Sequence, residues 1–168
     1  MEAPMTAFKK VQENDITKLA ALASKIWHEY WTEILTESQI EYMLENFQSV
    51  NAIEKQIAEE RYNYYFISDE NNENIGYFGI SNKENYMFLS KLYLSEEYRR
   101  KGIGKAAFEK IKQLTAKENL STIRLTVNKY NTKTINAYKK WGFIITDAVI
   151  TDIGSGFVMD DYIMEYYL

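Results

Sequence analysis

The segment from Arg99 to Lys105 combines two glycines, one residue apart, with four basic side chains. Gly102 and Gly104 stand just before apolar residues at helical spacing, so they fall where a helix begins. The first amide groups of a helix are unpaired and carry a partial positive charge. Glycine lets an anion approach them and tolerates positive φ angles. The segment therefore predicts a site for a pyrophosphate or a similar anion.

Other interpretations of the same glycines lead elsewhere. A flexible, solvated basic turn fits the composition equally well. A P-loop does not fit, because Gly102 and Gly104 are too close together. A dinucleotide-binding loop would have Ala107 in place of its third glycine, and Asn128 stands near the end of the next strand, where an acidic residue is needed.

A second motif follows a predicted strand at residues 121–128, in which apolar and polar residues alternate. Asn131 suits the N-cap of a helix, and Gly142 suits the position that ends one in the left-handed conformation. Tyr138 lies between them, and Phe143 follows directly. The sequence therefore predicts a short helix with an asparagine at its start and a tyrosine near its end.

With both motifs in this order, the chain resembles the GCN5-related N-acetyltransferases, or GNAT enzymes. The acetyl-CoA motif of that family, Arg/Gln-x-x-Gly-x-Gly/Ala, is matched by Arg99, Gly102 and Gly104. The later family signature has Asn, Tyr and then Gly-Phe at the spacing of Asn131, Tyr138, Gly142 and Phe143. The resemblance is close over residues 86–143 and looser outside them.

The resemblance implies transfer of an acetyl group from acetyl-CoA to a primary amine, by direct attack in a ternary complex and without a metal. The cosubstrate is then expected to contact Leu92, Tyr93, Leu94, Arg99, Arg100, Lys101, Gly102, Ile103, Gly104, Lys105, Asn131 and Lys133. Backbone amides at the first three of these positions are the best donors to the oxyanion. Tyr138 would protonate the departing thiolate. A tyrosine packed in the core is the alternative for that position.

The general base is left open, because the strand from Met87 to Leu94 contains Lys91 and no carboxylate. The candidates elsewhere are Glu84, Glu97, Glu29, Glu33 and His28. A lone histidine flanked by tryptophans is more often a packed or half-exposed residue than a catalyst.

In GNAT enzymes the first two helices and their junction cover the acceptor. The residues expected to bind it here are Trp27, Glu29, Tyr30, Trp31 and Glu33. Aromatic faces and carboxylates attract an ammonium group, although the same stripe also suits a buried core. The segment Gly156–Met164 is similar in layout to the last strand of bacterial polyamine acetyltransferases. We therefore expect a small cationic acceptor. The alternatives are a peptide, protein or amino-acid amine, or a CoA-binding domain that regulates or scaffolds without turnover.

The elements that must position these residues follow from periodicity and turn signals. Strands are expected at 8–11, 62–67, 75–80, 86–94, 121–128, 143–150 and 157–166, and helices at 15–30, 36–47, 51–60, 103–114 and 131–142. GNAT folds show this order in an α/β (α+β) fold. Its sheet is mixed, twisted and mostly antiparallel, with about seven strands and helices on both faces.

Composition sets the remaining limits. With 168 residues and 46% hydrophobic content, we expect a single GNAT domain over residues 1–168. The absence of cysteine excludes disulfides and thiolate nucleophiles. A net charge of −4 argues against nucleic acid as a partner. Without a signal core or a long apolar run, we expect a cytoplasmic enzyme with no membrane contact, acting alone or as a homodimer.

Overall fold

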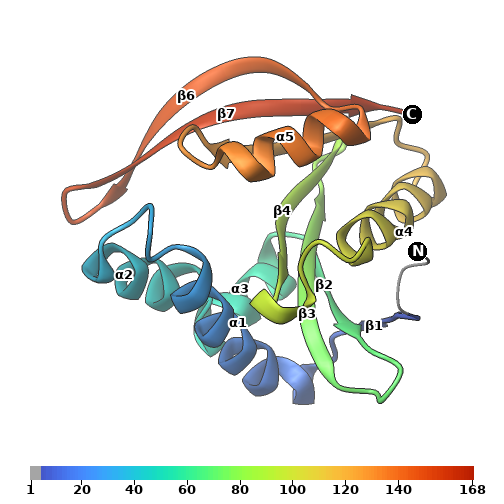
Figure 1. Ribbon diagram of the computed structural model, residues 1–168, viewed down its shortest axis with the longest axis horizontal. Coiled ribbons are helices and arrows are strands. Elements are labelled where there is room, and N and C mark those ends of the chain that lie inside the picture. The colour runs from blue at the N-terminus through green and yellow to red at the C-terminus, as the bar shows by residue number, and fades with distance from the viewer. Residues whose placement is uncertain (1–4) are drawn as a thin grey trace.

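The computed structural model describes residues 5–168, which fold around one seven-stranded sheet with the strand order β1-β2-β3-β4-β5-β7-β6 (Figure 1). The strands are β1 (Ala7–Lys10), β2 (Tyr62–Ser68), β3 (Asn74–Asn82), β4 (Met87–Leu94), β5 (Thr122–Asn128), β6 (Ile144–Gly154) and β7 (Phe157–Tyr167). The helices are α1 (Ile16–Tyr30), α2 (Glu37–Phe47), α3 (Val50–Glu59), α4 (Ile103–Lys117) and α5 (Thr132–Trp141). Short 3-10 turns, η1 (Glu13–Asp15) and η2 (Glu96–Tyr98), precede α1 and follow β4. The fold class expected from the sequence is confirmed.

The sheet separates two hydrophobic cores. In Figure 1, α1, α2 and α3 lie on one side of β2–β4, and α4 lies on the other. The α4 side is centred on Phe108, whose ring is 5.3 Å from Trp141, 5.2 Å from Phe143 and 5.1 Å from Tyr166 between centroids. These contacts join α4 to α5 and β7, and aromatic packing of this kind is among the largest contributions to a core.

The boundaries of several elements differ from the expected ones. Helix α3 begins after Ser49, whose Oγ accepts a hydrogen bond from the Ala52 amide, so Asn51 lies inside the helix. At α2, Thr36 is the N-cap, but only one of the two hydrogen bonds of a capping box with Gln39 is formed. Thr36 accepts from the Gln39 amide, but the Gln39 side chain reaches the Val158 carbonyl on β7 instead of the cap backbone.

Strands β4 and β5 are parallel neighbours that pair only at their beginnings, through Met87 with Ile123 and Phe88 with Arg124. Beyond these pairs the two strands separate. On its other edge β4 pairs with β3 throughout, with a register shift that places one extra residue, Ser90, on β4. A bulge of this kind bends the strand that carries it. The separation therefore arises from backbone geometry and leaves an opening in the middle of the sheet.

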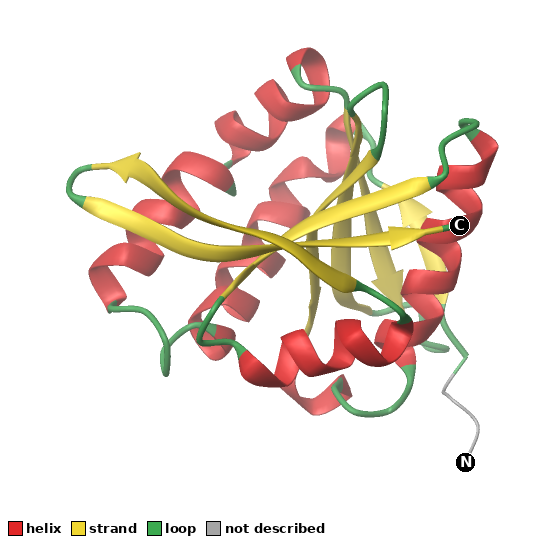
Figure 2. Cartoon of the chain, turned by 90° about the horizontal axis from the view of Figure 1, so that it is seen from above, coloured by secondary structure: helices red, strands yellow, loops and turns green. Residues whose placement is uncertain are grey.

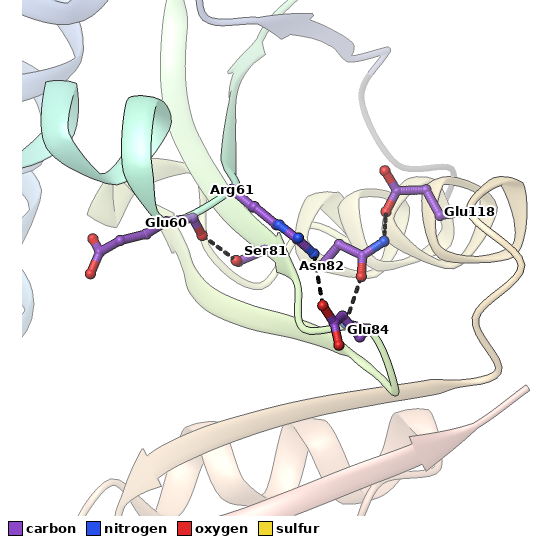
Figure 3. A network of polar contacts seen from close by, with 6 residues as sticks. All are labelled: Glu60, Arg61, Ser81, Asn82, Glu84 and Glu118. Atoms are coloured by element: carbon purple, nitrogen blue, oxygen red, sulfur yellow. Dashed lines mark hydrogen bonds and ion pairs between the residues drawn. The ribbon is translucent and has the colours of Figure 1, made fainter.

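The closed end of this opening is held by polar contacts between the end of α3, the β3–β4 turn and the end of α4 (Figure 3). Ser81 donates to the carbonyl of Glu60 at 2.8 Å, and the Asn82 side chain donates to Glu118 at 3.0 Å. The Asn82 side chain also accepts from the Glu84 amide at 2.8 Å. These contacts fix the strands where they still pair.

Strands β6 and β7 form a long twisted ribbon that crosses the top of the molecule (Figure 2). Its turn contains three consecutive residues with positive φ, Gly154, Ser155 and Gly156. The tip rests on α2, where the Tyr42 hydroxyl donates to the Ile153 carbonyl at 2.7 Å. Strand β6 runs to Gly154 rather than ending at residue 150. Within residues 5–168, no helix has the length and apolar character needed to cross a membrane.

Candidate active site

A cavity of about 210 Å³ lies where β4 and β5 separate. The two strands form part of its wall through Leu89 to Tyr93 and Leu125 to Asn128. Trp27 and Tyr30 of helix α1 line it together with Trp31, which directly follows the helix. Thr134 and Tyr138 of α5 do so as well, together with Asn131, which directly precedes that helix. The remaining wall comes from α2 and β7 through Met43, Phe47, Met159 and Asp161. The second predicted motif, through Asn131 and Tyr138, and the predicted acceptor helix therefore meet at one place, whereas the glycine-rich segment Arg99–Lys105 does not line this cavity.

Tyr138 reaches the cavity from the last turns of α5. Its side chain is 8% exposed, and among the described residues its hydroxyl makes no hydrogen bond. Burial, with a smaller effect from Tyr30, raises the pKa of Tyr138 above its ordinary value. The phenol is therefore protonated at neutral pH and can donate its proton to a ligand. Gly142 ends the helix at φ +107°, as expected.

Tyr93, on β4, lies between the helices that close the cavity. Its ring centroid is 5.2 Å from that of Tyr30, 5.5 Å from that of Trp27 and 6.4 Å from that of Trp31. Burial raises the pKa of Tyr93 well above its ordinary value, and the nearby groups Tyr30, Tyr138 and Asp161 act in the same direction. The Tyr93 hydroxyl therefore lies near the polar groups of Tyr30, Tyr138 and Asp161, in a cavity wall that is otherwise aromatic.

The expected N-cap interaction of Asn131 is not made. Its side-chain amide instead donates to the Tyr30 hydroxyl at 2.6 Å, and that hydroxyl also contacts Thr134. Tyr30 therefore connects the end of α1 to the start of α5 across the cavity. The amides at the start of α5 are left without a side-chain cap.

The glycine-rich segment has the geometry of an open helix start. Gly102 is the N-cap of α4 at φ +81°, and no side chain caps the helix. Arg100, just before it, also has a positive φ of 64°. Gly104 lies inside the first turn, so only the first glycine uses its conformational freedom. The side chains of Arg100, Lys101 and Lys105 are exposed around this start, and Lys133 is exposed at the start of α5.

Arg99 is directed inward rather than toward solvent. Its Nε donates to the Leu94 carbonyl at 3.0 Å, and its guanidinium carbon lies 4.9 Å from the centre of the Tyr30 ring. Its Nη2 is buried and has no hydrogen-bond partner among the described residues. Arg99 thus connects Leu94, at the end of β4, to Tyr30, which spans the cavity.

The predicted acceptor residues divide into two groups. Trp27, Tyr30 and Trp31 line the cavity, whereas Glu29 and Glu33 do not. The Glu29 carboxylate accepts a hydrogen bond from the Glu96 amide at 3.1 Å, and Glu33 is exposed in the turn after α1. For Glu29 the reason is helical periodicity, because it lies two residues after Trp27 on α1 and side chains two apart do not share a face.

The candidates for the general base also lie elsewhere. His28 contacts the Ser24 carbonyl through Nδ1 and Glu41 through Nε2, at 2.7 and 2.5 Å, and these partners raise its pKa. Glu84 lies at the closed end of the strands, and Glu97 is exposed on η2. Lys91 does line the cavity, but its Nζ donates to Ser90 at 2.6 Å. Desolvation lowers the pKa of Lys91 to about 8.

Asp161 on β7 was missed by the sequence analysis as a site residue. Its side chain is 8% exposed, lines the cavity, and leaves Oδ1 buried without a hydrogen-bond partner among the described residues. Burial raises the pKa of Asp161 to about 6, and the neighbouring Asp160 adds to this while Lys129 opposes it. Asp161 reaches the cavity because β7 pairs with β5, which places Asp161 opposite the cavity residue Asn128.

Comparisons with known proteins agree with this architecture. A family model described as the acetyltransferase (GNAT) family matches residues 23–143. A spermidine N(1)-acetyltransferase of Thermoplasma acidophilum is 26% identical over 155 residues, which is 90% of this chain and 94% of the relative. The structure of PaiA N-acetyltransferase from the same organism, in complex with coenzyme A, superposes with a TM-score of 0.81 at 23% identity, covering 98% of this chain and 99% of that one. A mutant form of the spermidine N-acetyltransferase SpeG from Vibrio cholerae has a TM-score of 0.68 at 18% identity, covering 96% of this chain and 93% of that one.

Proposed function

The chain belongs to the GNAT acetyltransferase family, and from this membership we propose that it transfers the acetyl group of acetyl-CoA to a primary amine of a small, cationic acceptor. The observation that supports this most strongly is the separation of β4 from β5 directly beside Tyr138. The separation leaves strand edges free for an extended ligand, and the tyrosine supplies a proton where that ligand would end.

Coenzyme A fits the residues around this opening. The uncapped start of α4 offers backbone amides to a pyrophosphate, and the exposed Arg100, Lys101 and Lys105 add positive charge. The carbonyl oxygen of the thioester would be stabilised by backbone amides of β4, as at other acyl-transfer sites. Asn131 and Lys133 at the start of α5 complete the proposed cosubstrate site.

The reaction proposed is direct attack in a ternary complex. The amine nitrogen forms a bond to the thioester carbon, the carbon–sulfur bond breaks, and Tyr138 protonates the departing thiolate. The chain has no cysteine to carry an acetyl group. The protein's own contribution is to align the two substrates and to supply the proton.

A small cationic acceptor is supported by the composition of the cavity wall. Trp27, Tyr30, Trp31 and Tyr93 present aromatic surfaces that attract an ammonium group, and Asp161 supplies the carboxylate. The similarity to a spermidine acetyltransferase points to the same class of acceptor.

The proposed function is tested by following thiol release from acetyl-CoA in the presence and absence of amines. Release that depends on the amine, together with an acetylated amine in equal amount, is expected. Coenzyme A binding without thiol release for any amine would favour a regulatory or scaffold role instead.

A further inference from the structure

A buried carboxylate oxygen without a hydrogen-bond partner is unusual, and within residues 5–168 Oδ1 of Asp161 is such an atom at the wall of the cavity. A buried ion normally finds a counter-ion or several hydrogen bonds, because its desolvation is costly. The neighbouring Asp160 has one, since its carboxylate lies 2.8 Å from the Lys129 ammonium. Asp161 is therefore either a strained structural residue or a group whose partner is the ligand.

The position of Asp161 relative to Tyr138 favours the ligand. Asp161 and its cross-strand neighbour Asn128 face the side of the sheet covered by α1 and α2, where the aromatic acceptor wall lies. Tyr138, on α5, belongs to the core on the opposite side of the sheet, which it shares with residues of α4. Tyr93 has both residues among its close neighbours. A base on the acceptor side and an acid on the cosubstrate side match the two proton transfers of aminolysis.

We propose that the Asp161 carboxylate is the general base of this enzyme and takes the first proton from the acceptor ammonium. The assignment rests on the proposed acetyl transfer to an amine. Asp161 accepts one proton and leaves a neutral amine, whose lone pair forms the new carbon–nitrogen bond. As the carbon–sulfur bond breaks, Tyr138 gives its proton to the thiolate and recovers one from the acetylated nitrogen. The proton on Asp161 then passes to water, so one proton is released for each amide formed.

The electrostatic surroundings of Asp161 suit a base that works near neutral pH. Asp160 on the same strand repels its negative charge, and Lys129, after β5, opposes that effect. Tyr30 on α1, Tyr138 on α5, and Lys91 and Tyr93 on β4 share its cavity. Burial raises the pKa of Tyr93 and of Tyr138, so these two phenols carry no charge at neutral pH. Burial lowers the pKa of Lys91 to about 8. The neighbours contributed by α2 and β6, Met43 in the cavity wall and Val149 across the strand pair, do not titrate. With a pKa of about 6, the carboxylate is ionised at pH 7 and remains basic enough to accept a proton.

The test compares wild type, Asp161→Asn and Asp160→Asn in thiol release between pH 5 and pH 9, with spermidine and with a monoamine. In wild type, kcat/KM should rise with pH through about 6. Asp161→Asn should lower kcat by roughly 10²-fold for both acceptors and remove that limb, so that the residual rate follows the ionisation of the amine itself. Acetyl-CoA should still raise its melting temperature. Asp160→Asn should keep kcat within a few fold and move the limb to lower pH.

Two results would overturn the assignment. Unchanged kcat in Asp161→Asn, with KM raised only for spermidine, would make Asp161 an anchor for the acceptor charge. If the Asp161→Asn variant does not fold, the assignment is tested on the wild type alone, by measuring the pH dependence of kcat/KM for acceptors whose amines differ in pKa. A limb that stays near 6 supports a base on the enzyme, whereas a limb that follows each amine excludes it. Wild type that acetylates no amine would instead refute the proposed function itself, before any variant is compared.

Discussion

At the scale of single residues, we propose that two groups carry the chemistry, and their environments differ in a way that supports the two roles proposed for them. Tyr138 is a neutral phenol held ready to donate, because burial raises its pKa. Asp161 is a carboxylate held in a site that suits its ionised form poorly. Groups of this kind are typical of functional sites, since evolution otherwise replaces them with residues that fold more stably.

Tyr138→Phe should lower kcat by about 10²-fold or more and keep the affinity for coenzyme A within a few fold. The ring and its packing against Phe143, at 5.3 Å between centroids, are retained, and only the proton is lost. Steady-state rates, with a single-turnover measurement to show that chemistry is rate-limiting, check this. Unchanged turnover would reduce Tyr138 to a packing residue.

Asp161→Asn should stabilise the free protein at pH 8 and have a much smaller effect at pH 4. The pKa of Asp161 is raised to about 6 in the folded state, so its ionisation opposes folding. The wild type therefore loses stability as the pH rises from the carboxyl pKa of the unfolded chain, about 4, to the folded value, by roughly 2 to 3 kcal/mol. Urea unfolding of both proteins at the two pH values measures the difference. A stability difference independent of pH would contradict the buried carboxylate.

The sequence was informative about residues whose roles depend on local structure. Gly102 and Gly142 were predicted from spacing because each belongs to a helix end, whereas the role of Tyr138 was implied by the resemblance to the GNAT enzymes. Glu29 could have been excluded by the same logic, since it lies two residues from Trp27 on one helix. Asp161 could not have been found, because its place depends on which strands become neighbours in the sheet.

At the scale of elements, the site is produced by two strands that begin as a pair and then separate. The bulge at Ser90 bends β4, and the contacts around Asn82 hold its beginning in place. Helix α4 then starts at the open end without a cap. Pattern and turn signals predicted these elements and their order, but the extent of β6 depended on its pairing with β7 and on the contact of the ribbon tip with α2. The start of α3 was misplaced by a local choice of cap, because Ser49 caps the helix rather than Asn51.

The two variants Gly104→Ala and Gly104→Val test the start of α4. A Cβ at this position would lie 3.4 Å from the Trp141 ring, which is an ordinary contact, so alanine should fold and still bind acetyl-CoA. Valine adds two methyl groups beside the amides that would bind the pyrophosphate, and binding should be lost. In wild type, ligand at 100 times its Kd adds about 2.7 kcal/mol to the free energy of unfolding. Thermal shifts of the three proteins measure this, and a valine variant that folds and binds normally would show that the loop assignment is wrong.

At the scale of the whole molecule, charge and shape point to a small cationic acceptor. The net charge is −4, and the basic side chains around α4 are a local exception that suits the phosphates of the cosubstrate. The β6–β7 ribbon covers the acceptor side from above, with its tip held by Tyr42 (Figures 1 and 2). The proposed acceptor would therefore enter an aromatic space beneath a ribbon, in a protein whose overall charge attracts cations.

The central claim is tested most directly by kcat/KM for three acceptors: spermidine, a monoamine of similar length and a neutral amino-acid amide. Thiol release is followed at low and at physiological ionic strength. Spermidine should be preferred by about tenfold or more, because a second ammonium group can lie on the aromatic wall while the first reacts. Its advantage should shrink as salt screens the attraction over about 8 Å. If the two acceptors without a second charge match or exceed spermidine at both ionic strengths, the cationic acceptor is contradicted.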